Sequence, residues 1–457
     1  MRPKEEFLQA TGQTAFNRDM HQKVHHAVEQ YETSLKHGVN QFSNLELARD
    51  RAAYIRWKVI ENLDKYLIEF EASIMRRGGK VLWANDSETA LQEIDQIVKK
   101  RNAKSIVKSK TNIGEEIGLN EHLRKNGVQL YETDLGEFIV DMAGEKPFHG
   151  VTPAMHKSRQ EIARLLNDKI SSSLEASAEE LSNDVRNELR DKFVKADIGI
   201  SGANFLIADS GMIAITENEG NARLATSFVH THIVLAGIER IVPTMNDLDL
   251  LLPLLATYGT GQHLTAYNTI VGPRSNEDVD GPREFIVILI DNGRSNLLAQ
   301  PDQRQALACI KCGACSNVCP VFQTIGGHAY GTAYTGPIGA VITPIMKGLD
   351  DYKHLSNAST LCGKCTDICP VKIDIHNHLL RNRRDVVNNG LAKNSEKLMW
   401  FSWKKIVLAR KNMNKGTSIK QFMLNSFFKT SWGERREFPK LAERSFNQLW
   451  REQFGQK

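Results

Sequence analysis

The sequence of 457 residues predicts an α/β domain with a parallel sheet, followed by a smaller helical domain. Two observations support this fold class. From residue 80 to about residue 294, short apolar runs alternate with amphipathic helical segments, which is the pattern of a parallel sheet with covering helices. All 7 cysteines then fall in two short runs near the carboxyl end. A chain of this length exceeds a typical single domain, so several domains are expected.

The domain boundaries are predicted where the sequence pattern changes. Residues 1–64 form a helical arm, because their apolar positions recur at helical spacing. Residues 65–299 form the α/β domain. Residues 300–388 contain the cysteines, and residues 389–457 form a basic tail.

The α/β domain is predicted element by element from its periodicity. Short apolar runs of three to five residues indicate strands, and longer amphipathic stretches indicate helices. The predicted strands are residues 80–84, 105–107, 128–132, 197–200, 204–208, 212–216, 231–235 and 285–289, and the predicted helices are residues 87–100, 114–125, 158–167 and 176–195.

The two cysteine runs have the spacing that holds iron-sulfur clusters. The first reads C-x2-C-x2-C-x3-C-P, and in two-cluster ferredoxins the fourth cysteine of such a run ligates the other cluster. Each run is therefore expected to serve both clusters. Cluster one is predicted to take Cys309, Cys312, Cys315 and Cys369, and cluster two is predicted to take Cys319, Cys362 and Cys365.

Cluster two lacks a fourth cysteine, because Ser359 stands where the second run would carry its first ligand. We expect a non-cysteine fourth ligand, an open iron site, or a cluster with only three irons. Zinc is the main alternative, since CxxC pairs also form zinc ribbons, but zinc sites close at four ligands. A disulfide framework is a weaker alternative. The long glycine-rich connection over residues 326–339 favours a helical ferredoxin-type domain over a compact ferredoxin.

Other motifs give weaker signals. No P-loop occurs, and the sequence Gly259-Thr260-Gly261 lacks the third glycine of a dinucleotide fingerprint, so we expect a turn there and no flavin or nicotinamide. The polar run at residues 216–223 follows a predicted strand, where ligands of α/β sheets tend to bind, but its composition favours a surface turn. We assign no catalytic role to four histidines near these motifs, which are His149, His156, His230 and His232.

Charge and hydropathy bear on the cellular compartment and the binding partners of the protein. The net charge of +5 is concentrated after Pro370, and no recognisable nucleic-acid-binding module accompanies it, so no nucleic acid is expected. The amino terminus lacks the apolar region of a secretory signal, and no segment is apolar enough to span a bilayer. Free thiolates fit a reducing compartment, so we expect a cytoplasmic protein. Basic residues beside Trp400, Phe401 and Trp403 are typical of a helix that docks on a partner or on the inner membrane face.

In combination with the cysteine runs, three motifs closely resemble the LutB/LldF family, which contains the iron-sulfur proteins of bacterial L-lactate utilisation. These motifs are DIGISGAN at residues 197–204, ENEGNAR at residues 217–223 and AGIERIVP at residues 236–243. The resemblance extends from about residue 50 to about residue 380. It implies a LUD domain, with a fold like NagB, RpiA and the CoA transferases, followed by a ferredoxin-type domain with two 4Fe-4S clusters. The same resemblance implies that the absence of a cysteine at position 359, where this chain has Ser359, is a feature of the family.

The resemblance also implies a function. The family works with two sister proteins, a cysteine-rich iron-sulfur protein and a lone LUD-domain protein, in oxidising L-lactate to pyruvate. We therefore expect an electron-transfer subunit with no assigned catalytic residue, in contact with these sister subunits and with a peripheral membrane surface or an electron carrier. The alternatives are an iron-sulfur subunit of another 2-hydroxy acid or glycerol phosphate dehydrogenase, and an isomerase-like or transferase-like enzyme with structural clusters.

Overall fold

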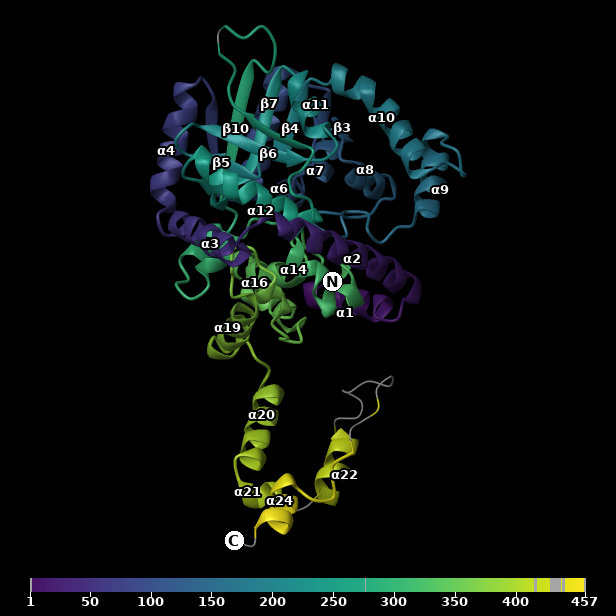
Figure 1. The fold of residues 1–457 in the computed structure, drawn as a ribbon, viewed down its shortest axis with the longest axis vertical. Coiled ribbons are helices and arrows are strands. Elements are labelled where there is room, and N and C mark those ends of the chain that lie inside the picture. Colours follow the sequence, from purple (N-terminus) through teal and green to yellow (C-terminus); the bar gives the residue numbers. More distant parts are fainter. Residues whose placement is uncertain (1, 276, 415–416, 428–436, 438–439, 456–457) are drawn as a thin grey trace. The chain divides into compact units, whose positions relative to one another are not determined.

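The chain divides into two compact units, Met1–Asp385 and Val386–Lys457. In the larger unit, the strands of the α/β region lie next to the helices that carry the cysteines (Figure 1). The computed structural model describes residues 2–275, 277–414, 417–427, 437 and 440–455.

Helices form the N-terminal segment, as the spacing of its apolar residues predicts. Two of them, α1 and α2, pack on the cysteine-containing region. Thr14 Oγ1 donates a hydrogen bond to the Ile325 carbonyl at 2.8 Å, and His21 Nε2 lies 2.9 Å from the Thr324 carbonyl oxygen. The segment therefore covers the cysteine-containing region. Its helices are α1 (Pro3–Thr14), α2 (Arg18–Gly38), η1 (Val39–Gln41), α3 (Leu45–Glu61) and α4 (Leu63–Arg76).

Six strands form one sheet in the order β1-β10-β7-β4-β2-β3, and every neighbouring pair is parallel, which confirms the predicted parallel sheet. The order reverses at β2, because β3 lies on one side of β2 and β4 on the other. The carboxyl ends of β2 and β4 therefore flank a crevice of the kind in which α/β sheets bind ligands. The strands are β1 (Lys80–Ala84), β2 (Ser105–Lys108), β3 (Gln129–Glu132), β4 (Ile198–Gly202), β7 (Thr231–Gly237) and β10 (Glu284–Ile290).

Helices cover both faces of this sheet, so its strands are apolar on both sides. Ile106 packs with Ile94 and Leu119 on one face, whereas its neighbour Val107 packs with Leu166 on the other. Adjacent residues of a strand point to opposite faces, so these two contacts define two covering layers. The helices are α5 (Ser87–Arg101), α6 (Asn112–Glu116), α7 (Leu119–Lys125), α8 (Leu135–Met142), α9 (Arg159–Ile170), α10 (Ala178–Lys195) and α11 (Asn221–Ser227).

A second, four-stranded sheet has the order β8-β5-β6-β9. The predicted strands β5 and β6 pair antiparallel, β9 extends the sheet beside β6, and β8 pairs with β5 in parallel. The sequence did not predict β8 or β9, because the first is only two residues long and the second is polar and half-exposed. The strands are β5 (Phe205–Ile207), β6 (Met212–Glu217), β8 (Ile241–Val242) and β9 (Tyr267–Val271).

Two predictions about glycines are corrected by the structure. The single helix predicted over residues 114–125 is wrong, because Gly118 adopts φ 70° and separates α6 from α7. The turn predicted at Gly259 is also misplaced, since Gly259 and Thr260 end helix α12 (Leu248–Thr260) and the backbone turns only at Gly261, with φ 76°. Two short helices precede α12 and one follows β10: η2 (Ile238–Arg240), η3 (Met245–Asp247) and α13 (Arg294–Leu298).

The secondary structure between residues 300 and 388 consists of helices alone. Cys312 and Cys315 share one hydrophobic core with Val24 of α2 and Leu254 of α12, so this region packs against the rest of the larger unit. The helices are η4 (Arg304–Ala308), α14 (Ala314–Asn317), α15 (Pro320–Ile325), η5 (His328–Tyr330), α16 (Gly336–Lys347), α17 (Leu349–Tyr352), η6 (Leu355–Asn357), α18 (Lys364–Asp367) and α19 (Ile375–Asn388).

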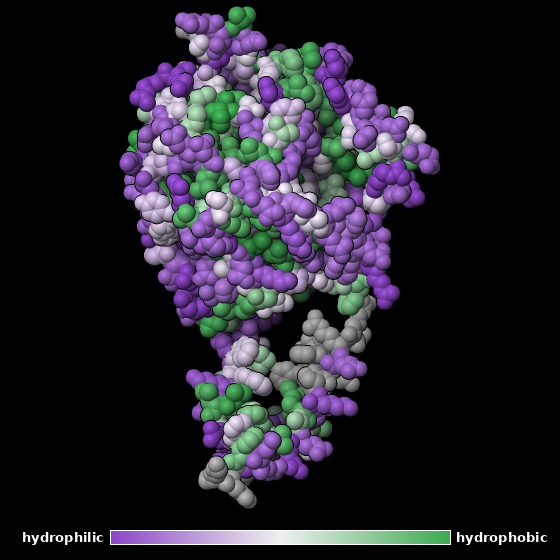
Figure 2. Space-filling view, in the orientation of Figure 1, coloured by the Kyte–Doolittle hydropathy of each residue, from purple (hydrophilic) through white to green (hydrophobic). Residues whose placement is uncertain are grey.

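The C-terminal unit is helical and exposes large apolar side chains. Trp400, Phe401 and Trp403 are each more than half exposed, and Figure 2 shows hydrophobic side chains on the surface of this unit. Among the described residues, no helix has the length and apolar composition to cross a membrane. The described helices are α20 (Asn394–Val407), α21 (Arg410–Met413), α22 (Thr417–Phe427) and α24 (Phe446–Phe454).

Candidate iron-sulfur centre and adjoining cavity

The two cysteine loops have the same local conformation. In the first, the Lys311 N–H donates to Cys309 Sγ at 3.3 Å, and in the second the Leu361 N–H donates to Ser359 Oγ at 3.1 Å. Lys311 and Leu361 both adopt left-handed backbone conformations, with φ 60° and 57°, which non-glycine residues rarely adopt. Ser359 therefore occupies in the second loop the position that Cys309 occupies in the first.

Four cysteines form one group, although one of them comes from the second run. Burial and the nearby Cys309 raise the pKa of the Cys369 thiol to about 12. Burial also raises the pKa of Cys315, and Cys309, Cys312 and Cys369 lie close enough to raise it further. The Arg49 guanidinium holds this end of the second run, since its Nη2 donates to the Cys369 carbonyl at 2.9 Å.

The remaining three cysteines form a second group. Burial raises the pKa of the Cys365 thiol to about 11, and the nearby Cys319 and Cys362 add to the effect. Cys362 is exposed, and the Lys364 N–H holds the pKa of its thiol below the usual value. This group therefore lies closer to solvent than the first.

The donor set fits iron-sulfur clusters. All seven cysteines are free, and the high pKa values of the buried thiols mean that their thiolates require positive charge nearby, which cluster iron supplies. Backbone N–H groups already point at two sulfurs of the first group, from Lys311 to Cys309 and from Ile373 to Cys369, each at 3.3 Å. Such N–H···S contacts stabilise and tune a cluster.

A buried ionic network in the α/β region is hydrogen-bonded to the cysteine region through Tyr334. Arg294 Nη2 lies 2.7 Å from Glu116 Oε2, and Arg294 Nε lies 2.6 Å from Glu239 Oε2. Tyr334 OH donates to Glu116 at 2.6 Å. The buried Arg56 side chain also bridges the regions, because it donates to the carbonyls of Glu239 and Ala308. These contacts hold the first cysteine loop against the edge of the sheet.

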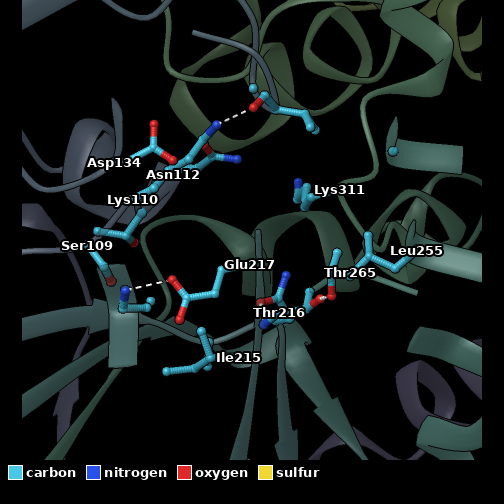
Figure 3. A pocket seen from close by; sticks show the side chains of 18 of the residues that line it. Ser109, Lys110, Asn112, Asp134, Ile215, Thr216, Glu217, Leu255, Thr265 and Lys311 are labelled. Carbon is cyan, nitrogen blue, oxygen red and sulfur yellow. Dashed lines mark hydrogen bonds between the residues drawn. The ribbon is translucent and has the colours of Figure 1, made fainter. Parts of the chain in front are cut away.

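A cavity of about 380 Å³ lies at the carboxyl edge of the parallel sheet. Ser109 follows β2 and Ala203 follows β4, so the cavity occupies the crevice where the strand order reverses. Its other wall includes Lys311 and Cys312 of the first cysteine loop. Figure 3 shows Lys311 reaching the cavity across from Glu217. The cavity therefore adjoins the predicted site of cluster one.

Three carboxyl groups line the cavity. Burial raises the pKa of Asp134 and of Glu217 above their usual values, and burial together with Asp134 raises the pKa of Glu219 to about 7. Glu217 accepts hydrogen bonds from the N–H groups of Ala222, at 2.6 Å, and Arg223, at 3.0 Å. The polar run at residues 216–223 thus contains the end of β6 and the start of α11, and it lines the cavity. The surface turn that its composition favoured is therefore corrected.

The histidines singled out in the sequence lie in different places. His232 is fully buried and bonds Ser201 at 2.7 Å, whereas His230 is exposed. His149 is buried beside the first cysteine loop, and His156 Nε2 lies within hydrogen-bond distance of Glu145 Oε2, at 2.7 Å. A group of three possible metal ligands, Glu145, His156 and His328, has its ligand atoms within 4.8 Å of one another, but Lys157 already pairs with Glu145 at 2.6 Å.

Comparisons with known proteins cover both regions. A family model described as the LUD domain matches residues 67–290, and one described as a 4Fe-4S dicluster domain matches residues 305–373. The first range includes the six strands of the parallel sheet, and the second includes the cysteine loops up to residue 373.

Two similar proteins carry the name lactate utilization protein B. The one from Oceanobacillus iheyensis is 41% identical over 425 residues, covering 90% of this chain and 89% of its own. The one from Bacillus cytotoxicus is 38% identical over 434 residues, covering 92% and 91%. A solved structure, a DUF162 family protein from Deinococcus radiodurans, covers 50% of this chain and 98% of its own at 14% identity, with a TM-score of 0.29 that is too low to indicate a shared fold.

Proposed function

The chain belongs to the lactate utilization protein B family, and we propose that it is the iron-sulfur electron-transfer subunit of an assembly that oxidises L-lactate to pyruvate. One observation carries the proposal: seven free cysteines lie in two groups within a region that matches a 4Fe-4S dicluster domain. Lactate oxidation releases two electrons and two protons, and a dicluster chain offers two one-electron positions.

We propose crossed ligation of two 4Fe-4S clusters within a helical ferredoxin-type domain. The proximity of Cys369 to Cys309 supports a first site completed from the second run. The repeated loop conformation supports Ser359 Oγ as a weak fourth ligand of the second site. The proposed ligands are Cys309, Cys312, Cys315 and Cys369 for cluster one, and Cys319, Cys362 and Cys365 with Ser359 for cluster two.

The α/β region is proposed to have the NagB, RpiA and CoA transferase type of fold. Its parallel sheet and the cavity at the carboxyl edge support this assignment. On this proposal the LUD region holds a ligand and the helical region carries electrons. Tyr334 joins the two regions, because its hydroxyl group accepts a hydrogen bond from Arg294 and donates one to Glu116.

The partners are proposed to be a cysteine-rich iron-sulfur protein and a lone LUD-domain protein. The exposed Cys362 supports this, because it places the second cysteine group where another redox protein can approach. We propose that the complex works in the cytoplasm, and that the exposed aromatic and basic residues of α20 bind a partner subunit or the inner membrane face.

Growth on a single carbon source tests the function. We expect a deletion strain to lose growth on L-lactate while it keeps growth on D-lactate, glycolate and glycerol. A plasmid copy carrying Cys312→Ser should fail to restore growth, and Ser182→Ala, on the exposed face of α10, should restore it fully. Normal growth of the deletion strain on L-lactate, or loss on another of these substrates instead, would contradict the proposal.

A further inference from the structure

The cavity beside the first cysteine loop is lined by a buried cation that has no hydrogen-bond or ion-pair partner among the described residues. Arg240 ends the short helix that follows β7, only 8% of its surface is exposed, and it lines the cavity. Within the described part of the chain, its guanidinium makes no hydrogen bond or ion pair. The neighbouring Glu239 forms its ion pair with Arg294 instead, at 2.6 Å. Burying an unpaired guanidinium is unfavourable, so this one is suited to an anion that enters the cavity.

A second cation faces the same space. Lys311 has the left-handed backbone of the cysteine loop, and its Nζ lies 4.1 Å from the centroid of the Tyr334 ring. No residue in the described part of the chain accepts a hydrogen bond from this ammonium group. The third lysine or arginine on the cavity wall, Lys110, differs, because it donates to the Val151 carbonyl at 2.6 Å. Arg240 and Lys311 therefore form the cationic end of the cavity, and neither side chain donates a hydrogen bond to a described residue.

The remaining wall is suited to a hydroxyl group. Ser109 is buried at the end of β2 and lines the cavity, and its Oγ has no hydrogen-bond partner within the described residues. Asp134, Glu217 and Glu219 add carboxyl oxygens that accept from a hydroxyl group. The cavity thus presents cations next to Cys312 and hydroxyl partners elsewhere on its wall.

We infer that this cavity binds a small 2-hydroxy carboxylate, with the carboxylate paired to Arg240 and Lys311 and the hydroxyl group directed to the Ser109 and Glu217 wall. A guanidinium and an ammonium group together match a carboxylate through charge-assisted hydrogen bonds. The choice of a 2-hydroxy acid over other anions rests on the proposed function. Binding there places the ligand against the Cys312 loop.

A simpler role for the two cations is compensation of the negative charge of four thiolates. The two roles make different predictions. Charge compensation predicts that removing a cation changes the reduction potential of cluster one and leaves ligand affinity unaltered. A ligand site predicts that affinity falls in the same variants.

The test is equilibrium dialysis of the full, cluster-loaded chain with radiolabelled L-lactate under anaerobic conditions. We expect saturable binding of one L-lactate per chain, weakened about tenfold or more by Arg240→Gln and by Lys311→Gln, since each removes a charged hydrogen-bond partner. Arg240→Lys should recover part of the affinity. Arg190→Gln on α10 and Lys125→Gln on α7, both exposed, are the matched controls and should bind as the wild type does.

A steric variant covers the case in which loss of a cation prevents cluster assembly. A Cβ at Gly259 would lie 3.7 Å from the Cys312 carbonyl oxygen, in ordinary contact, so Gly259→Val should fit and reduce the cavity without altering charge. We expect it to weaken lactate binding and to leave the iron content unchanged.

Three outcomes overturn the inference. The first is no saturable binding of L-lactate by a chain that restores growth of the deletion strain, which leaves the proposed function intact. The second is equal competition by phosphate or acetate, which indicates a general anion site. The third is a shift of the cluster-one potential in Arg240→Gln and Lys311→Gln at unchanged affinity, which assigns the cations to the cluster.

Discussion

Ser359→Cys tests the assignment of the second cluster site most directly. In the wild type, Ser359 Oγ accepts the Leu361 N–H at 3.1 Å, just as Cys309 Sγ accepts the Lys311 N–H at 3.3 Å. A cysteine at this position should therefore aim its sulfur as Cys309 does. We expect the variant to hold a fourth thiolate on cluster two without any backbone movement.

The size of the effect follows from the ligand count. A chain with two complete cubane clusters holds roughly eight irons, and loss of one corner iron from cluster two leaves roughly seven. The wild type should lose that iron in air, because a hydroxyl oxygen binds iron more weakly than a thiolate and the neighbouring Cys362 is exposed. If the thiolate raises the activation barrier for iron loss by ~1.4 kcal/mol, the loss slows about tenfold.

The assay is a time course of iron content and of the three-iron signal in electron paramagnetic resonance after exposure to air. Ser359→Ala should lose the iron faster than the wild type does. Asn357→Cys is the matched control, because it adds an exposed thiol two residues away from the ligand position, and it should behave as the wild type does. Equal protection by Asn357→Cys, or a wild type that keeps both clusters whole in air, would refute the reasoning.

Four further predictions follow from the same structure. Cys369→Ser should damage cluster one, as resolved by Mössbauer and paramagnetic resonance spectroscopy, although Cys369 lies in the second run. Arg294→Gln leaves buried carboxylates unpaired and should lower the free energy of unfolding by about 3–5 kcal/mol in denaturant titrations of the full chain. Burial lowers the pKa of His232 to about 3; its folded pKa lies below its unfolded value, so stability should fall as the pH drops below about 6.5, by at most ~1.4 kcal/mol per pH unit. The double variant of His232→Leu with Ser201→Ala should flatten that slope. Deletion of residues 386–457 should release the chain from its partners or from anionic vesicles and leave the iron content unchanged, as measured by co-purification and flotation.

Each of these predictions has an outcome that contradicts it. Damage confined to cluster two in Cys369→Ser would exclude crossed ligation. Unchanged stability in Arg294→Gln would show that the buried network does not stabilise the folded chain. An unaltered pH slope in the double variant would assign the slope to other groups, and loss of iron on deletion of residues 386–457 would mean that this unit is needed to retain the clusters.

The sequence predicted the parallel sheet well, because its strands are short apolar runs bounded by turn residues. It did not predict α11, since residues 221–227 are polar and continue a loop-like run. The assignment of the cysteines to two cluster sites rests on their spacing, which is a local property and can be read from the sequence. The cavity cations did not, because Arg240 and Lys311 are 71 positions apart in the sequence and meet only when the cysteine loop packs on the sheet.

The shared hydrophobic core around the cysteines sets an order of events during synthesis. Val24 and Ala52 leave the ribosome long before Cys312 and Cys369, yet all four belong to the core that encloses the first cysteine group. The early helices therefore complete their packing only after the cysteine runs have been synthesised. If the proposed crossed ligation holds, iron delivered before the second run emerges meets an incomplete set of sulfurs. We therefore expect cluster insertion to be a late step of biogenesis that completes this core.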